Sequence, residues 1–263
     1  MKQFKSLDDQ LDYLHKEKHV YFQDKKYAKT ILLNCNYYNL ISCGKVKYAL
    51  DIVKNSHKYN PSKFEEWQKY FEEDCIVSQY LMGNMIEFER TISTINSRVA
   101  YYVGELIENN ILKPAKKNEI IDQIKKAEIK KLPDYTGKET WKYITKMTFG
   151  ETKELLIWLL DSQKKTFNKI IIGYDYLRTG NIKQNLSNIV ELRNTLFHFT
   201  PLNVYLSFAK RYDGTYDNTY RKNTVNFIYK LNSDTDIKQT LAQIMKNSDN
   251  FVKIKNSQGL DQD

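Results

Sequence analysis

Glycine and proline are scarce in this chain of 263 residues, which contains 9 glycines and 4 prolines. These residues mark most turns, so their scarcity predicts few β-turns and many helices. Cysteine is scarce as well: Cys35, Cys43 and Cys75 are odd in number and form no Cys-x-x-Cys pair. Reduced thiols in a cytoplasmic protein fit this pattern better than a disulfide framework.

Long apolar runs are also lacking. No stretch approaches the roughly 18–20 apolar residues that span a bilayer, and Met1 leads into a charged segment instead of a signal peptide. His15 and His19 have a helical spacing that could bind a metal, but no acidic or cysteine ligand set completes a site. We therefore expect a cytoplasmic protein that requires no membrane, no metal and no other cofactor.

Positive charge and tyrosine are what the chain has in excess. Lysine and arginine number 41 against 32 acidic residues, which gives a net charge of +9, and there are 20 tyrosines. Cations that meet phosphates and rings that meet bases indicate RNA as a partner. AT-rich bacterial genomes encode a similar composition whatever the protein binds, so composition leaves both interpretations open.

The segment that ends at Pro201 carries the clearest functional pattern. Arg193 is followed directly by Asn194, and His198 comes after four intervening residues. Proline disfavours helical geometry at the preceding residue, so we expect His198 in the last turn of a helix. Helical spacing places Arg193 near the middle of an apolar arc, with His198 on the opposite side close to Asn194 and Glu191.

Burial of a guanidinium costs on the order of several kcal/mol unless it is paired. Arg193 should therefore meet a carboxylate, a phosphate or a cleft at an interface, and we expect the amide of Asn194 to orient the imidazole of His198. An arginine that binds phosphate and a histidine that transfers protons suit cleavage of a phosphodiester. An Arg-x4-His spacing also arises by chance, and a histidine at a helix end is often only a cap.

One long helix is expected over 63–108, because its apolar residues follow an unbroken 4-3 alternation. Such a stripe packs against another helix, either within a bundle or across a dimer. Glu89 lies just off the stripe and is a candidate partner for Arg193, although such a residue is more often solvated. The stripe consists of Leu81, Met85, Phe88, Ile92, Ile95, Val99, Tyr102 and Leu106.

Two basic segments are candidate RNA-binding surfaces. One is an insertion at 109–140 with a short amphipathic helix, and the other is a basic, aromatic loop after the motif helix. Single-stranded RNA is bound by rings that stack on bases and cations that contact phosphates, although a charge run is more often simply solvated. The candidate residues are Lys116, Lys117, Lys125, Lys126, Lys210, Arg211, Tyr212, Tyr216, Arg221 and Lys222.

The remaining segments are predicted more coarsely. Residues 1–60 are expected to form short helices, and helix returns over 141–263. Within that last part, 225–231 is either a short strand or a continued helix. The tail beyond Asn250 is expected to be frayed, as chain ends often are.

Three segments resemble stretches of the abortive-infection proteins of the AbiD/AbiF type, within the HEPN superfamily. Residues 36–40 read N-Y-Y-N-L, 141–150 read W-K-Y-I-T-K-M-T-F-G, and 191–198 read E-L-R-N-T-L-F-H. They occur in the family's order and extend over most of the chain. Many members have alanine before the histidine and a second histidine or asparagine after it, where this chain has Phe197 and Phe199.

The resemblance implies an all-α, HEPN-type helical bundle. An N-terminal helical subdomain at 1–62 would precede a HEPN-like domain at 63–263, which carries the basic helical insertion at about 109–140. It implies a metal-independent endoribonuclease toxin of antiviral defence by abortive infection. In the AbiF branch, a small structured RNA is encoded nearby, so RNA is expected as substrate and a non-coding RNA as antitoxin or guide.

Arg193 and His198 are the catalytic pair that the resemblance implies, with Asn194, Glu191 and Glu89 in support. One chain supplies one motif, so we expect a homodimer in which two motif helices form a single cleft. A histidine would take the proton of a ribose 2′-OH or protonate the leaving 5′-oxygen, leaving a 2′,3′-cyclic phosphate. Two other interpretations stay open: a non-catalytic RNA-binding HEPN module, and a helical protein that binds another protein.

Overall fold

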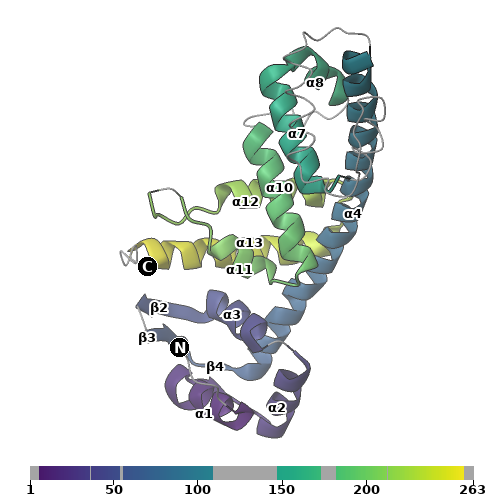
Figure 1. Ribbon diagram of the computed structural model, residues 1–263. Coiled ribbons are helices and arrows are strands. Elements are labelled where there is room, and N and C mark those ends of the chain that lie inside the picture. The colour runs from purple at the N-terminus through teal and green to yellow at the C-terminus, as the bar shows by residue number, and fades with distance from the viewer. Residues whose placement is uncertain are drawn as a thin grey trace. The chain divides into compact units, whose positions relative to one another are not determined.

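The computed structural model describes residues 6–35, 37–53, 56–108, 147–172, 182–211 and 213–257. Helices contain 78% of the described residues, which confirms the predicted all-α class (Figure 1). Contacts divide the chain into two units, one formed by 1–84 and 192–263 and the other by 85–191. The first unit thus joins the predicted N-terminal subdomain to both ends of the predicted 63–263 domain. Two helices, α4 (Phe64–Glu108) and α10 (Ile182–Phe197), contribute to both units.

Local capping signals explain where the helices of the first unit begin. Ser6 and Asp9 form a capping box at the start of one helix, and the Asp24 side chain accepts two backbone N–H groups at the start of the next. Helices that belong wholly to this unit are α1 (Leu7–Lys18), α2 (Lys25–Asn34), α3 (Tyr37–Tyr48), α11 (Leu202–Ser207), α12 (Thr219–Lys230) and α13 (Thr235–Ser257).

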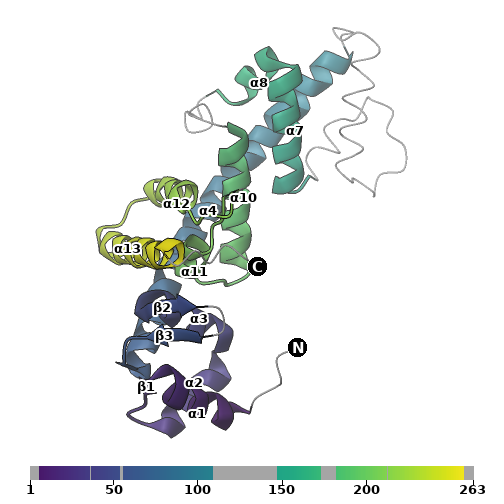
Figure 2. The same ribbon diagram turned by 90° about the vertical axis from the view of Figure 1, so that its left-hand side faces the viewer.

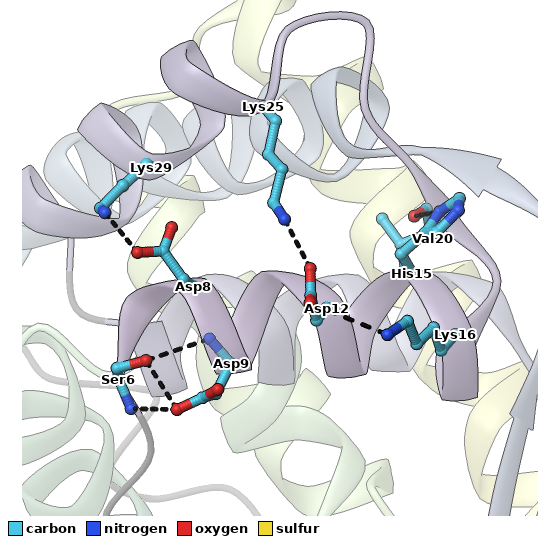
Figure 3. Close-up of polar contacts among 9 residues, drawn as sticks. All are labelled: Ser6, Asp8, Asp9, Asp12, His15, Lys16, Val20, Lys25 and Lys29. Carbon is cyan, nitrogen blue, oxygen red and sulfur yellow. Dashed lines mark hydrogen bonds and ion pairs between the residues drawn. The ribbon is translucent and has the colours of Figure 1, made fainter.

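Ion pairs join α1 to α2 on the protein surface (Figure 3). Lys25 contacts Asp12, and Lys29 contacts Asp8 at 2.7 Å. Both pairs are exposed, so solvent screens them and they contribute little to stability. His15 of α1 has its Nδ1 atom 3.3 Å from a carbonyl oxygen of the strand that follows. This histidine therefore helps to fasten the end of α1.

Short strands interrupt the N-terminal helices, so the prediction of helices alone over 1–60 is wrong. They form two sheets of two strands each, one parallel and one antiparallel. The parallel pair joins segments that lie far apart in the sequence, and its strands have only two residues each. Strands this short contain no alternation of apolar and polar residues from which they could be predicted. The pairs are β1 (Val20–Tyr21) with β4 (Ser62–Lys63), and β2 (Ala49–Val53) with β3 (Ser56–Tyr59).

Trp67 of α4 lies in the centre of the N-terminal core and is fully buried. Tyr48 stacks on it with ring centroids 5.5 Å apart, and its indole N–H donates to Ser62. A Cβ atom added to Gly44 would lie 2.1 Å from the Trp67 ring. Only glycine therefore allows α3 to approach this side chain so closely.

Phe251 of α13 belongs to the same core and is fully buried. α13 extends to Ser257, so the expectation of a frayed tail beyond Asn250 is wrong for 251–257, and 258–263 lie outside the described residues. The burial of Phe251 explains the difference, because apolar packing orders the end of the helix. α12 covers 219–230, which decides in favour of helix over strand for nearly all of 225–231.

The second unit contains α7 (Phe149–Ser162) and α8 (Lys164–Ile170) together with parts of α4 and α10. Both views show α7 and α8 beside the C-terminal half of α4 (Figures 1 and 2). Thr148 and Glu151 form a capping box that starts α7. Arg98 of α4 donates to the carbonyl oxygen of Ile170, 3.1 Å away, and so fastens the end of α8.

The long helix expected over 63–108 is confirmed, and its apolar stripe is buried from Leu81 to Val99. The step after Val99 differs from the predicted alternation: Val103 is fully buried, whereas Tyr102 is only half-buried. An α-helix has 3.6 residues per turn, so a strict seven-residue repeat drifts around it. The insertion at 109–140 and Trp141 lie outside the described residues.

Candidate functional site

α10 ends at the predicted place, and His198 is its C-cap residue. The N–H of Phe199 donates to the carbonyl of Leu196, and the N–H of Thr200 donates to that of Thr195, both at 3.1 Å. This pair of bonds closes a helix when the next residue adopts the left-handed conformation. Phe199 has a φ of 55°, in a position that glycine usually occupies. Its side chain is 76% exposed.

Arg193 lies at the border of the apolar face of α10 and not at its middle. Its side chain is half-buried, and its Cζ atom lies 4.6 Å from the centre of the Phe197 ring. A guanidinium on a ring face is attracted by the π-electrons. The face is narrower than predicted because Phe197 itself is only half-buried. Its buried members are Leu186, Ile189, Leu192 and Leu196.

His198 and Asn194 are both exposed, and they do not form the predicted side-chain contact. The carbonyl of Asn194 accepts the backbone N–H of His198 at 2.9 Å. The Asn194 side chain instead accepts from Nη1 of Arg193 at 3.4 Å. Among the described residues, none hydrogen-bonds to the His198 imidazole, so the ring is open to a substrate.

Arg193 and His198 are five positions apart, and at about 100° per residue their side chains leave the helix roughly 140° apart. One chain does not point both groups at one atom by helix geometry alone. Glu191 and Glu89 are half-buried and belong to the second unit. The pairing of Glu89 with Arg193 therefore stays a prediction.

The backbone that follows His198 is anchored by two residues from distant parts of the sequence. Asn39 donates its side-chain N–H to the carbonyl of Phe199 at 3.0 Å. Asp74 accepts the N–H of Leu202 at 2.7 Å and that of Asn203 at 2.9 Å. Asn39, from the segment 36–40, thus contacts the residue that directly follows the segment 191–198.

Asp74 was not singled out by its sequence, yet it is the most deeply buried carboxyl group of this site. It is 0% exposed, and it caps α11 where Pro201 has no side-chain acceptor. Burial raises the pKa of Asp74 to about 6, although its bonds to the N–H groups of Asn203 and Leu202 act in the opposite direction. The carboxylate costs free energy to bury but satisfies two backbone donors.

A signal for Asp74 does exist in the sequence. The apolar stripe of α4 extends toward the N-terminus with the same spacing, through Trp67, Tyr70, Val77 and Leu81, all buried. Asp74 occupies the position in the middle of this series. A carboxylate at a core position of a heptad stripe is rare unless it has partners, so this position indicates a buried polar contact.

A pocket opens beside Phe199, on the side of Asp74. Phe71 and Met82 of α4 line it from one side, and Leu196 and Pro201 line it from the other. Its empty volume, including open solvent, is about 400 Å³. Its lining is mostly apolar, so the surface beside the candidate histidine is suited to a flat, weakly polar group such as a base.

Asn203 continues the anchoring into the core. Its side chain donates to the carbonyl oxygen of Cys43 at 3.0 Å and lies 3.1 Å from the Cys43 sulfur. Burial raises the pKa of the Cys43 thiol well above its usual value. A thiol that stays protonated is a poor nucleophile, so Cys43 is a structural residue that holds α3 against α11.

The predicted basic loop after α10 consists of a hairpin and the start of a helix. Lys210 and Tyr216 pair across the hairpin, whereas Arg221 and Lys222 lie on α12. Tyr212 and the four lysines of the insertion, Lys116, Lys117, Lys125 and Lys126, lie outside the described residues.

Three of the predicted RNA-binding cations have partners within the protein. Arg211 pairs with Asp217, and Lys222 pairs with Asp249 at 2.7 Å. Arg221 lies over the ring of Tyr205 in α11 and donates to the carbonyl oxygen of that residue. The charges of these cations are therefore at least partly neutralised within the protein.

No protein-family model, curated protein or solved structure matches this chain. The likeness to HEPN proteins rests on the three sequence segments. In the described part of the chain, none of the helices is long and apolar enough to cross a membrane. The described His, Cys, Asp and Glu side chains form no group of three that could hold a metal ion.

Proposed function

We propose that this chain is a metal-independent endoribonuclease toxin of the HEPN type that acts in abortive infection. Arg193 and His198 are its proposed catalytic pair. The observation that carries the proposal is the exposed imidazole at the end of α10, on a backbone segment fixed by Asn39 and Asp74. RNA is the proposed substrate, and a structured non-coding RNA is the proposed regulator.

The reaction needs a base, an acid and a phosphate ligand. A histidine removes the proton of the ribose 2′-OH, whose oxygen attacks the adjacent phosphorus. The bond from phosphorus to the 5′-oxygen breaks, and an acid protonates that oxygen. The products are a 2′,3′-cyclic phosphate and a free 5′-OH. Arg193 would bind the phosphate oxygens as charge develops on them.

A homodimer would supply both histidines and both arginines. Arg193 and His198 leave α10 on different sides, so two copies of the helix end offer a geometry that one copy does not. The fixed C-cap favours this arrangement, because a catalytic group must be held within a narrow range of positions. The position of His198 is set by backbone hydrogen bonds of the residues around it.

A second candidate function is RNA or partner binding without catalysis. This function is favoured by the hydrogen bonds that the side chains of Arg193 and His198 form or lack within the described part of the chain. Arg193 is already stacked on Phe197 and bonded to Asn194, as a structural arginine would be. His198 lacks the orienting hydrogen bond that a general base commonly has, at least among the described residues.

One experiment separates the two candidates. The purified protein is incubated with RNA in excess EDTA, and the ends of the products are identified. We expect cleavage with 2′,3′-cyclic phosphate ends in the parent and none in His198→Ala. Lys230→Ala serves as a control, because it removes another exposed side chain at a helix end. Binding without cleavage by the parent would leave the non-catalytic function.

The dimer is tested by its size. Arg193→Ala should abolish cleavage while the assembly keeps the mass of a dimer in analytical ultracentrifugation. A monomer that cleaves RNA at the full rate would contradict the shared cleft. A charge placed at an interface position should abolish both dimer and activity.

A further inference from the structure

Lys255 is a nearly buried lysine within a cage of aromatic rings. The residue is 7% exposed. Its Nζ atom lies 3.6 Å from the centre of the Tyr216 ring, 4.2 Å from that of Phe208 and 5.7 Å from that of Phe251. Ring faces attract a cation and compensate in part for the water that it loses. They provide no hydrogen-bond acceptor for the three N–H groups of an ammonium.

Further positive groups surround this amine. Burial, together with the smaller effect of the charges of Lys45 and Lys210, lowers the pKa of Lys255 to about 8. Nζ of Lys45 lies 3.1 Å from Nε2 of His57, and Nζ of Lys210 lies over the ring of Tyr216. Elements distant in sequence thus bring three lysines together.

The surroundings of the amine come from four parts of the first unit. Lys45 lies on α3, Lys210 on the hairpin after α11, His57 on β3 and Lys255 on α13. α13 packs against α3 and β2, and Figure 1 shows its C-terminal end beside β2. Asn256 holds the hairpin in place, because its side chain accepts the N–H of Tyr216 and donates to the carbonyl of Tyr216, each at 3.0 Å. The cluster therefore lies on an ordered framework.

Lys255 and Lys210 differ from neighbouring cations in their ion pairs. Arg211 and Lys222 have carboxylate partners in Asp217 and Asp249. Within the described part of the chain, neither Lys255 nor Lys210 forms an ion pair. Lys255 and Lys210 lie over the same Tyr216 ring. Two like charges held close together destabilise the fold, and a bound anion relieves this cost.

We propose that Lys255 and Lys210 bind a phosphate group of single-stranded RNA, with the Lys255 amine as its central ligand. A phosphate oxygen accepts the N–H groups that the aromatic cage leaves without an acceptor. RNA is favoured over a free anion because Phe208, 38% exposed, offers a ring face beside the lysines on which a base can stack. The choice of RNA rests on the proposed function.

The test measures the binding of a fluorescent single-stranded RNA oligonucleotide to the full chain with His198→Ala, which keeps the RNA intact. Lys255→Gln is expected to weaken binding about tenfold or more, since a charge-assisted bond is lost. It should also reduce the slope of log Kd against log salt by roughly 0.7, the value for one phosphate on a single strand. Lys255→Arg should restore most of both quantities.

Lys230→Gln, an exposed lysine at the end of α12, is the matched control and should change Kd less than twofold. Lys210→Gln is the second variant, because its side chain lies on the hairpin surface and its loss should leave the fold intact. Circular dichroism and thermal unfolding establish that each variant is folded. If both cluster variants bind RNA with the parental Kd and salt slope, the site is overturned.

Inorganic phosphate and a mononucleotide are tested as competitors. We expect each to displace the RNA only at concentrations far above the Kd of the RNA. Either of them binding as tightly as the RNA would assign the cluster to a free phosphate and overturn the RNA site. If binding depends on Lys255 but the chain with His198 intact cuts no RNA, this site is supported and the nuclease is refuted. Cleavage with unaltered binding in the cluster variants would do the reverse.

Discussion

His198 and Lys255 are basic side chains of the same unit with opposite surroundings. The imidazole of His198 is exposed at a helix end, whereas Lys255 is caged by three rings and lies near two other lysines. A local motif marks the histidine, and no motif marks the lysine. The difference shows that spacing reveals a group placed by its own helix, whereas a group placed by tertiary contacts stays hidden.

The largest expected effect is on the rate of RNA cleavage. His198→Ala should lower the rate of RNA cleavage about 10²–10⁴-fold, because acid–base catalysis is lost, while Kd for RNA stays close to parental. Lys255→Gln should do the opposite, with a weaker Kd and nearly the parental rate at saturating RNA. Single-turnover kinetics at several RNA concentrations measure both quantities. Equal losses of rate at saturation in both variants would erase the distinction.

A second prediction concerns the anchor behind His198. Asp74→Asn keeps one acceptor but directs a donor at a backbone N–H, so it should lower the free energy of unfolding by about 1–3 kcal/mol. Chemical denaturation measures this loss. Ser78→Ala is a control, since that hydroxyl lies 3.4 Å from Asp74 and contributes a weak bond.

Asp74 should also leave a signature in the pH dependence of stability. Its pKa is about 6 in the folded protein and 3.8 in the reference state, so the folded protein binds more protons between these values. Its contribution to stability is therefore complete below about pH 4 and declines as pH rises to about 6. Denaturation at a series of pH values should show this decline in the parent and not in Asp74→Asn. The same slope in both would mean that another group causes it.

The smallest prediction concerns the strained residue beside His198. Phe199→Gly should raise the free energy of unfolding by roughly 1 kcal/mol, because glycine adopts a positive φ without a Cβ clash. Phe199→Ala removes the same ring but keeps the Cβ atom, so it should bring no such gain. If the glycine variant is more stable but cleaves RNA more slowly, the exposed ring contributes to substrate binding.

Much of the fold follows from the sequence, because helices are encoded by local periodicity. The 45-residue helix α4 and the end of α10 were predicted from apolar spacing and from Pro201. The two-residue strands β1 and β4 were not, since their pairing depends on residues far apart. The order of the C-terminal helix was missed for the same reason: Phe251 is buried by the N-terminal core.

Some residues of the candidate site could be predicted from the sequence, and others could not. Arg193 and His198 were found because five positions on one helix fix their separation. The half-burial of Arg193 was not predictable, because helical periodicity gives direction but not the width of the covered face. Asp74 and Lys255 become visible only when α4 meets α11 and when α13 meets the hairpin.

The contact between Asn39 and Phe199 has a consequence for the synthesis of the chain. It joins residues 160 positions apart, and the core around Leu11 is completed by Phe251. The chain must therefore be synthesised beyond Phe251 before this core is complete. Non-local contacts of this kind form late in folding. For the proposed ribonuclease this means that the region that positions His198 is assembled only after the segment around Phe251 has been made, so the proposed activity would be absent from shorter nascent chains.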